Sequence, residues 1–276
     1  MLIGAMNHPA RDAIGEIRWM AKMGLEFIDL TLEPPGAASW KVKPREIAQA
    51  LSDHGFKIVG HTAYYLPMAS PFEGVRRGAV DEFRRCLEIF AILGARWMNM
   101  HPQAYAPMHD RAYIVERNLA TITDLLPEAR GCGVGLMIEN LPGDWNNVLQ
   151  LSQLLDPIPE LGLHLDIGHA NLQVTRNTTD EILRAYGSRL RHVHLHDNKG
   201  GFQDLHLPIG CGTLEVNNCV GALKRSGYDG TITLEVFSED REYLARSRDV
   251  LRKLWDESKD GPAQAKNLPV ASAACC

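Results

Sequence analysis

Three histidines occupy alternate positions in residues 192 to 200, which read HVHLHDNKG. Alternate side chains of a β-strand point to the same face, so His192, His194 and His196 would share one face and Val193 and Leu195 the other. Imidazoles bind divalent metals and transfer protons, but a buried histidine also serves simply as a hydrogen-bonded core residue. The spacing therefore predicts either a metal-binding strand or a polar core.

Other ligand-type side chains stand at or just after the ends of further short apolar runs. A single histidine there is more often a packing residue than a ligand. Several neighbouring carboxylates, however, cannot all stay ionised without a compensating cation, and imidazoles with carboxylates but no cysteine suit Zn, Mn, Fe or Co. We therefore predict a bound divalent metal among His61, His101, Glu139, Asp166, His169, His194, Asp204, His206 and Glu235.

Eight short β-type runs alternate with longer amphipathic segments along the chain. The runs are residues 2–5, 26–32, 57–61, 96–101, 134–139, 161–166, 191–196 and 231–237. Several segments between them have apolar residues at three- and four-residue spacing and a closing glycine, which is typical of helices. Eight such units predict a single (β/α)8 TIM barrel, an α/β fold of about 250 residues. A doubly wound sheet would need a glycine-rich phosphate turn after the first strand, which is missing here.

The barrel domain is expected to span residues 1–257. Residues 258–276, which begin SKDGPAQ, have no periodicity, so we expect a disordered C-terminal tail there.

A barrel brings the carboxyl ends of its strands to one rim, where barrel enzymes carry out their chemistry. Side-chain alternation predicts that Leu136 and Ile138 face the helices while Glu139 faces the axis. The same phase in the last run places Leu234 outward and Glu235 inward. The ligand-type residues should therefore meet at that rim.

The composition is that of an ordinary globular protein, with 276 residues, 45% hydrophobic and 23% charged. A net charge of -5 argues mildly against a broad nucleic-acid surface. The sequence shows neither a membrane-spanning run nor a signal peptide, so we expect a cytoplasmic protein with no membrane partner. The six cysteines form no C-x-x-C pair and are expected to be reduced thiols.

Six phrases of the chain carry a resemblance to a known family. These are HTAYYLPMASP, MNMHPQAY, MIENLPG, LHLDIGHAN, HVHLHDNKG with DLHLPIGCG, and LEVF. Together they resemble the xylose-isomerase-like TIM barrel superfamily over residues 1 to about 255. That superfamily contains sugar and sugar-phosphate isomerases and epimerases, and also the endonuclease IV class of abasic-site nucleases.

The resemblance implies two nested ligand sets. In the isomerases and epimerases one metal is held by positions that match Glu139, Asp166, His194 and Glu235. The nuclease class builds a three-zinc cluster with five further ligands, which match His61, His101, His169, Asp204 and His206. One to three ions are therefore implied.

For a carbohydrate substrate, the resemblance implies an acid and a base on two faces of the carbon next to a carbonyl, with the metal polarising the oxygens. Glu139 and Glu235 would be these catalytic groups. Backbone amides around Gly210 and Gly212 would either receive a phosphate or form a plain turn. The candidate substrate-binding residues are His169, His196, Tyr64 and Trp145.

For a phosphodiester substrate, two or three metals would stabilise the attacking and leaving oxygens, which would explain nine ligands. The chain nevertheless departs from the nuclease pattern: it reads DIGH instead of DTCH, has His196 instead of an asparagine, and carries an acidic loop, TLEPPGAASW. An acidic loop is a poor partner for a phosphate backbone.

We therefore favour a metal-dependent sugar or sugar-phosphate isomerase or epimerase, and keep a trinuclear-zinc abasic-site endonuclease as the alternative. Nucleic acid is a partner only under that alternative. A third interpretation is a barrel that binds sugars without catalysing a reaction. The sequence does not decide whether the protein forms a homodimer.

Overall fold

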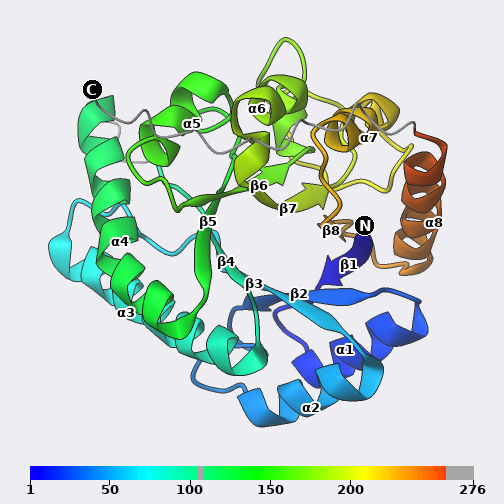
Figure 1. Ribbon diagram of the computed structural model, residues 1–276, viewed down its shortest axis with the longest axis horizontal. Helices are drawn as coiled ribbons and strands as arrows, with labels where there is room; N and C mark the ends of the chain where they lie inside the picture. The colour runs from blue at the N-terminus through cyan, green and yellow to red at the C-terminus, as the bar shows by residue number, and fades with distance from the viewer. Residues whose placement is uncertain (105–107, 259–276) are drawn as a thin grey trace, which may run out of the picture.

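The computed structural model describes residues 1–104 and 108–258, and its centre is a closed barrel of eight parallel strands paired in sequence order. In Figure 1 the strands form a ring and the helices lie outside it. This arrangement confirms the predicted single (β/α)8 barrel. The strands are β1 (Leu2–Met6), β2 (Phe27–Leu32), β3 (Lys57–Thr62), β4 (Trp97–Met100), β5 (Gly135–Glu139), β6 (Gly162–Asp166), β7 (Leu190–Leu195) and β8 (Thr231–Leu234).

The helices follow the strands and end as their sequences predict. Gly55, Gly94 and Gly133 adopt left-handed conformations just after α2, α3 and α4, where a side chain would be strained. The helices are α1 (Ala13–Lys22), α2 (Pro44–His54), α3 (Glu73–Leu93), α4 (Arg111–Cys132), α5 (Val148–Leu155), α6 (Thr179–Tyr186), α7 (Val216–Arg225) and α8 (Glu242–Glu257), with short 3-10 turns η1 (His169–Asn171) and η2 (Gly187–Arg189).

The interior of the barrel changes character along its axis. Near the amino ends of the strands, Phe27, Val59 and Met137 form a small apolar cluster separate from the main core between strands and helices. Toward the carboxyl ends of the strands, the inward-facing positions are polar. The register of β6 and β7 places Asp166 beside His194. The apolar layer therefore closes one end of the barrel and leaves the other end for polar groups.

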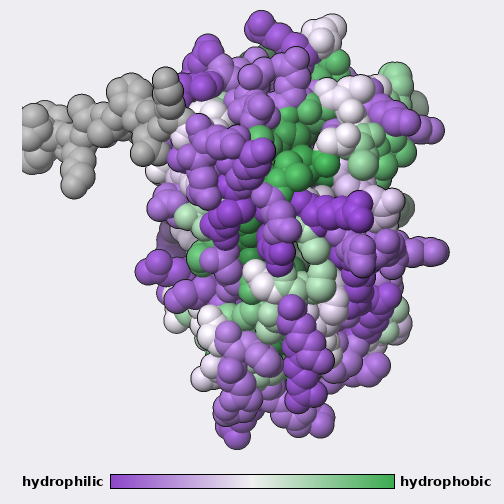
Figure 2. Space-filling view, turned by 90° about the vertical axis from the view of Figure 1, so that its right-hand side faces the viewer, coloured by the Kyte–Doolittle hydropathy of each residue, from purple (hydrophilic) through white to green (hydrophobic). Residues whose placement is uncertain are grey.

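The outer surface seen from the α8 side is mostly hydrophilic, with a narrower apolar band (Figure 2). Ion pairs join neighbouring helices, for example Arg84 of α3 and Glu128 of α4 at 2.7 Å. None of the helices in the described part of the chain is long and apolar enough to cross a membrane.

Three predicted runs extend slightly too far. The strands β4, β7 and β8 stop one to three residues before the predicted ends, so His101, His196 and Glu235 lie just past the strands. The expected tail begins at Ser258, the last residue described, and 259–276 lie outside the described residues.

Candidate metal centre

The nine candidate ligands all come from the carboxyl ends of β3 to β8 or from the loops that follow. Most of them are buried although they are polar. Buried polar groups need partners, so the contacts among these side chains are informative. Several overlapping sets of these side chains have ligand atoms within 4.8 Å of one another, and we describe them, together with His196, as three adjoining groups.

The first group joins His61, His101 and Glu139. The Nε2 atoms of the two histidines lie 3.1 Å apart, and Glu139 Oε2 lies 3.0 Å from His101 Nε2. Thr31 Oγ1 is 3.1 Å from His61 Nδ1, and the Asn99 amide donates a 2.7 Å hydrogen bond to Glu139 Oε2. Three ligand atoms thus converge from three consecutive strands.

The central group holds Asp166, His194 and Glu235. His194 Nδ1 lies 3.2 Å from Glu235 Oε2 and 3.8 Å from Asp166 Oδ2. Asp166 is fully buried, and within residues 1–104 and 108–258 its Oδ2 atom has no hydrogen-bond partner. A buried carboxylate oxygen without a donor is costly unless a cation or a further group binds it.

Asp29 is a residue of the candidate site that the sequence reasoning missed. Its Oδ2 atom lies 2.6 Å from His194 Nε2 and 3.2 Å from His192 Nε2, and it accepts a 3.0 Å hydrogen bond from Thr233 Oγ1. A carboxylate on the far nitrogen of an imidazole fixes which nitrogen is free to bind a metal. The available signal was a charged residue at an inward position inside the run FIDL.

The electrostatics keep the buried carboxylates ionised. Burial would raise the pKa of Glu139, but His164 and His101 outweigh it and hold that pKa well below its usual value. The pKa of Asp166 is likewise lowered, because His169 and His196 outweigh its burial. Ionised carboxylates are the form that binds metals.

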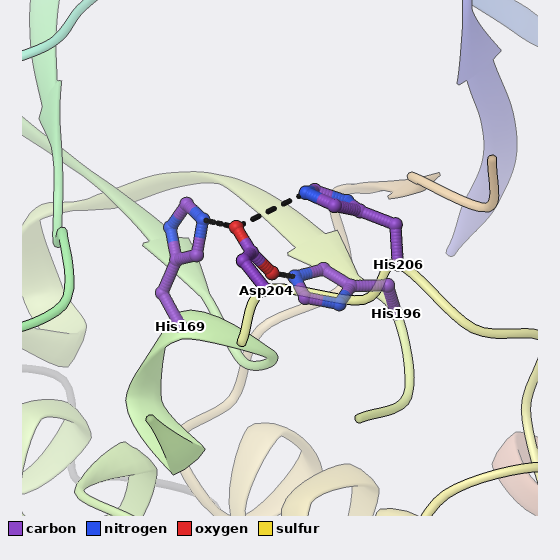
Figure 3. A group of neighbouring side chains, drawn as sticks. All are labelled: His169, His196, Asp204 and His206. Atoms are coloured by element: carbon purple, nitrogen blue, oxygen red, sulfur yellow. Dashed lines mark hydrogen bonds and ion pairs between the residues drawn. The ribbon is translucent and has the colours of Figure 1, made fainter. Parts of the chain in front are cut away.

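The third group joins His169, His196, Asp204 and His206. Figure 3 shows the Asp204 carboxylate between His169 on one side and the other two imidazoles on the other. Asp204 Oδ2 lies 3.1 Å from the Nε2 atoms of both His169 and His206, and Asp204 Oδ1 lies 3.5 Å from His196 Nε2. His196, expected to contact substrate, therefore lies among ligand-type side chains.

Gly168 and His196 are in direct contact. A Cβ atom added at Gly168 would lie 2.2 Å from His196 Nε2, which is an impossible approach. Two departures from the nuclease pattern, glycine for the cysteine of DTCH and histidine for asparagine, are thus in direct contact. The space that a cysteine side chain would occupy holds an imidazole ring.

The glycine-flanked loop after β7 does not offer its amides to a phosphate. The Asp197 carboxylate already accepts hydrogen bonds from the backbone N–H groups of Asn198, Gly210, Gly212 and Leu214, at 2.8 to 3.1 Å. The plain-turn interpretation is therefore correct at Gly210 and Gly212, because the protein itself supplies the anion.

Two further candidates have very different surroundings. Tyr64 is 69% exposed, and its ring centroid lies 6.5 Å from that of His101, beside the metal-ligand groups. Trp145 is 1% exposed and belongs to the main core, with the Arg111 guanidinium 3.8 Å from its ring centroid. The enclosed position of Trp145 gives no support to its predicted contact with substrate, which stays a prediction.

The chain is similar in sequence to several known proteins. A curated uncharacterised protein, MJ1311 of Methanocaldococcus jannaschii, is 31% identical over 223 residues, which cover 77% of this chain and 74% of the relative. A probable endonuclease 4 of Aquifex aeolicus is 26% identical, covering 81% of this chain and 86% of the relative.

Among solved structures, a D-tagatose 3-epimerase-like protein superposes with a TM-score of 0.82 at 23% identity, covering 93% of this chain and 97% of that one. The family model described as xylose isomerase-like TIM barrel matches residues 17–254. The chain therefore belongs to the xylose isomerase-like TIM barrel family.

Proposed function

We propose that this protein is a divalent-metal-dependent sugar or sugar-phosphate isomerase or epimerase, which moves a proton at the carbon next to a carbonyl. One observation carries the proposal: Glu139, Asp166, His194 and Glu235 come from β5, β6, β7 and the end of β8, four consecutive strands of the rim. The two glutamates therefore stand at the two ends of an arc, with the other two residues between them.

The donor set fits a divalent metal. Asp166 Oδ2 is buried without a hydrogen-bond partner, and His194 directs Nδ1 toward it because Asp29 engages Nε2. Three carboxylates with one imidazole suit Mn, Co, Fe or Zn. When bound, such an ion would polarise the carbonyl and hydroxyl oxygens of a sugar.

The glutamates supply the proton transfer. The pKa of Glu139 is held well below its usual value by the neighbouring histidines, so the carboxylate is ionised and is the group that would accept the proton from the substrate. Glu235, 8% exposed, would return a proton from the other end of the arc. At the mouth, the exposed ring of Tyr64 offers an apolar face for the C–H side of a sugar.

Deuterium exchange tests this function directly. We would incubate the metal-loaded protein in D2O with a panel of ketoses and ketose phosphates, and follow deuterium next to the carbonyl by NMR. Exchange should occur with at least one sugar and fall about 100- to 10,000-fold in Glu139→Gln and Glu235→Gln. The matched control is His54→Ala, an exposed residue at the end of α2. Undiminished exchange in both glutamine variants would reject the proposal.

A second function, cleavage of phosphodiesters as in the probable endonuclease 4 relative, is favoured by one specific observation. Glu139 belongs to two groups of side chains whose ligand atoms lie within 4.8 Å of one another, one with His61 and His101 and the other with Asp166 and His169. A carboxylate so placed fits a bridge between two metal ions.

Assay of an abasic-site oligonucleotide, together with metal analysis, separates the two functions. Cleavage that is lost in His61→Ala and His101→Ala would establish the phosphodiesterase. Sugar exchange that survives in these two variants would establish the isomerase.

A further inference from the structure

We propose that His169, His196, Asp204 and His206 form a separate, closed metal site, of the kind that holds a structural zinc ion, with His196 as its fourth ligand. The family resemblance provides for three of these residues, and only as part of a catalytic cluster. The role of His196, and the closure that it produces, come from the geometry of this chain. The inference holds for either proposed reaction.

The ligand spacing fits a tetrahedral ion. Metal–ligand distances of about 2.1 Å correspond to edges of about 3.4 Å between neighbouring ligand atoms of a tetrahedron. The separations from the Asp204 carboxylate to the three imidazole Nε2 atoms are 3.1, 3.1 and 3.5 Å, and all four ligand atoms lie within 4.8 Å of one another. The Asp204 carboxylate and the three Nε2 atoms are therefore close enough for a single ion to contact all four residues.

All three imidazoles present the same nitrogen to the site. The Nδ1 atom of His169 lies 3.0 Å from the backbone oxygen of Asn140, and that of His206 lies 3.1 Å from the backbone oxygen of Glu235. His196 Nδ1 lies 3.4 Å from the backbone oxygen of Asp197. Because each Nδ1–H donates to a carbonyl, each Nε2 faces Asp204 and is the metal-binding atom, which is the arrangement usual for metal-ligating histidines.

The surroundings of the His196 side chain indicate that its Nε2 atom binds a metal ion. Its side chain is fully buried, and its Nε2 atom has no hydrogen-bond partner among the described residues, although carboxylate oxygens of Asp166 and Asp204 lie 3.4 and 3.5 Å away. A buried imidazole nitrogen without a partner is costly. Gly168 provides the space for this ring, since any side chain there would overlap it.

The number of protein ligands indicates the role of the site. Four protein ligands leave no coordination position for substrate or water, which is typical of structural zinc sites. The ligands come from η1, from the end of β7 and from the loop that follows β7. The His206 ring also stacks between those of His196 and Phe237, at centroid distances of 4.1 and 4.2 Å. A bound ion would therefore fasten the loop after β7 to the barrel.

Metal analysis of the full-length protein tests the ligand set. We would strip the metals, reload with Zn2+ or Co2+, and compare wild type with His196→Ala, Gly168→Ala and the control His54→Ala. Both site variants should lose one equivalent of metal, bind it at least about 100-fold more weakly, and lose the intense visible absorption of tetrahedral Co2+. Gly168 has no ligand atom, so its effect isolates the position of the His196 ring. Unchanged metal content and spectra in both variants would overturn the proposal.

Trypsin cleavage of the wild-type protein is an independent test that needs no variant to fold. Lys199 is exposed in the loop after β7 and is followed by Gly200. Cleavage between them should be slow with Zn2+ bound, become at least tenfold faster after chelation, and slow again when Zn2+ is restored. A cleavage rate that is the same with and without Zn2+ would contradict a structural ion in this site. Neither readout depends on sugar exchange or on DNA cleavage.

Discussion

The central ligand group and the loop-borne ligand group are built in different ways. In the central group, Asp166 and His194 belong to the strands themselves and Glu235 directly follows β8, and sheet register places Asp166 beside His194. Asp204 and His206 lie on the long loop between β7 and α7, and His206 has a positive φ of 43°. Hydrogen-bonded strands position side chains without help, whereas a loop depends on its own contacts or a ligand. We therefore expect the central group to take part in catalysis and the loop-borne group to control the conformation of the loop after β7.

The largest effect should follow from removing the buried charge of the central group. Asp166→Asn keeps the volume but takes away the anionic ligand, so we expect loss of the central metal and at least about a 100-fold loss of kcat. Elemental analysis and sugar exchange measure both. Because Asp204 belongs to the other group, Asp204→Asn is the matched comparison and should retain the central metal. Equal metal loss in the two variants would erase the distinction between the groups.

A smaller loss is expected from Asp29, which contacts the ligand His194 and not the metal. Asp29→Asn should weaken the central metal by about 10- to 100-fold, since such supporting carboxylates fix the orientation of a ligating imidazole. Chelator competition measures the affinity. The exposed Asp53 of α2 supplies the control Asp53→Asn, which should bind like wild type. If Asp29→Asn also binds like wild type, strand register alone positions His194.

The apolar end of the barrel should affect stability without affecting metal binding. Met137→Ala opens a cavity beside Phe27 and Val59, so we expect a loss of about 2 to 5 kcal/mol in the free energy of unfolding. Denaturant titration gives that value, and metal content should stay constant. Met108→Ala, at a position 94% exposed, should leave both unchanged. A fall in metal content in Met137→Ala would show that the two ends of the barrel are coupled.

The smallest catalytic effect is expected at Trp145. Because the ring is buried in the core under Arg111, Trp145→Phe should lower stability slightly and leave the KM for the sugar unchanged. Steady-state kinetics with the sugar identified by deuterium exchange provide the measurement. A several-fold rise in KM would support Trp145 as a wall of the substrate pocket.

The fold was predictable because every strand and helix carries its own local signal. Period-two alternation located β5 and β6 and also the inward direction of Glu139 and Asp166, since both follow from the same pattern. Asp29 was missed because the partners of a carboxylate inside a strand cannot be predicted until the strand across the barrel is known. His192 and His194 are more than 160 residues away from it, and only barrel closure brings them together.

The contacts between loops were beyond local patterns for a similar reason. In the sequence, Gly168 and His196 are two separate departures from the nuclease pattern. Only the three-dimensional structure shows that Gly168 makes room for the His196 ring. The identity of Trp145 as a core residue was also hidden, because a tryptophan near a strand end is compatible with either a pocket or a core.

The Asp197 carboxylate, which gathers four backbone amides of its own loop, has a consequence for relatives of this protein. A homologue could keep every histidine and glutamate of the rim and still lose the shape of the loop if this one aspartate were replaced. Gly212 belongs to the same requirement, because a side chain there would overlap Asp197 and Asn198. The shape of the loop therefore depends on Asp197 and Gly212 as well as on the metal ligands.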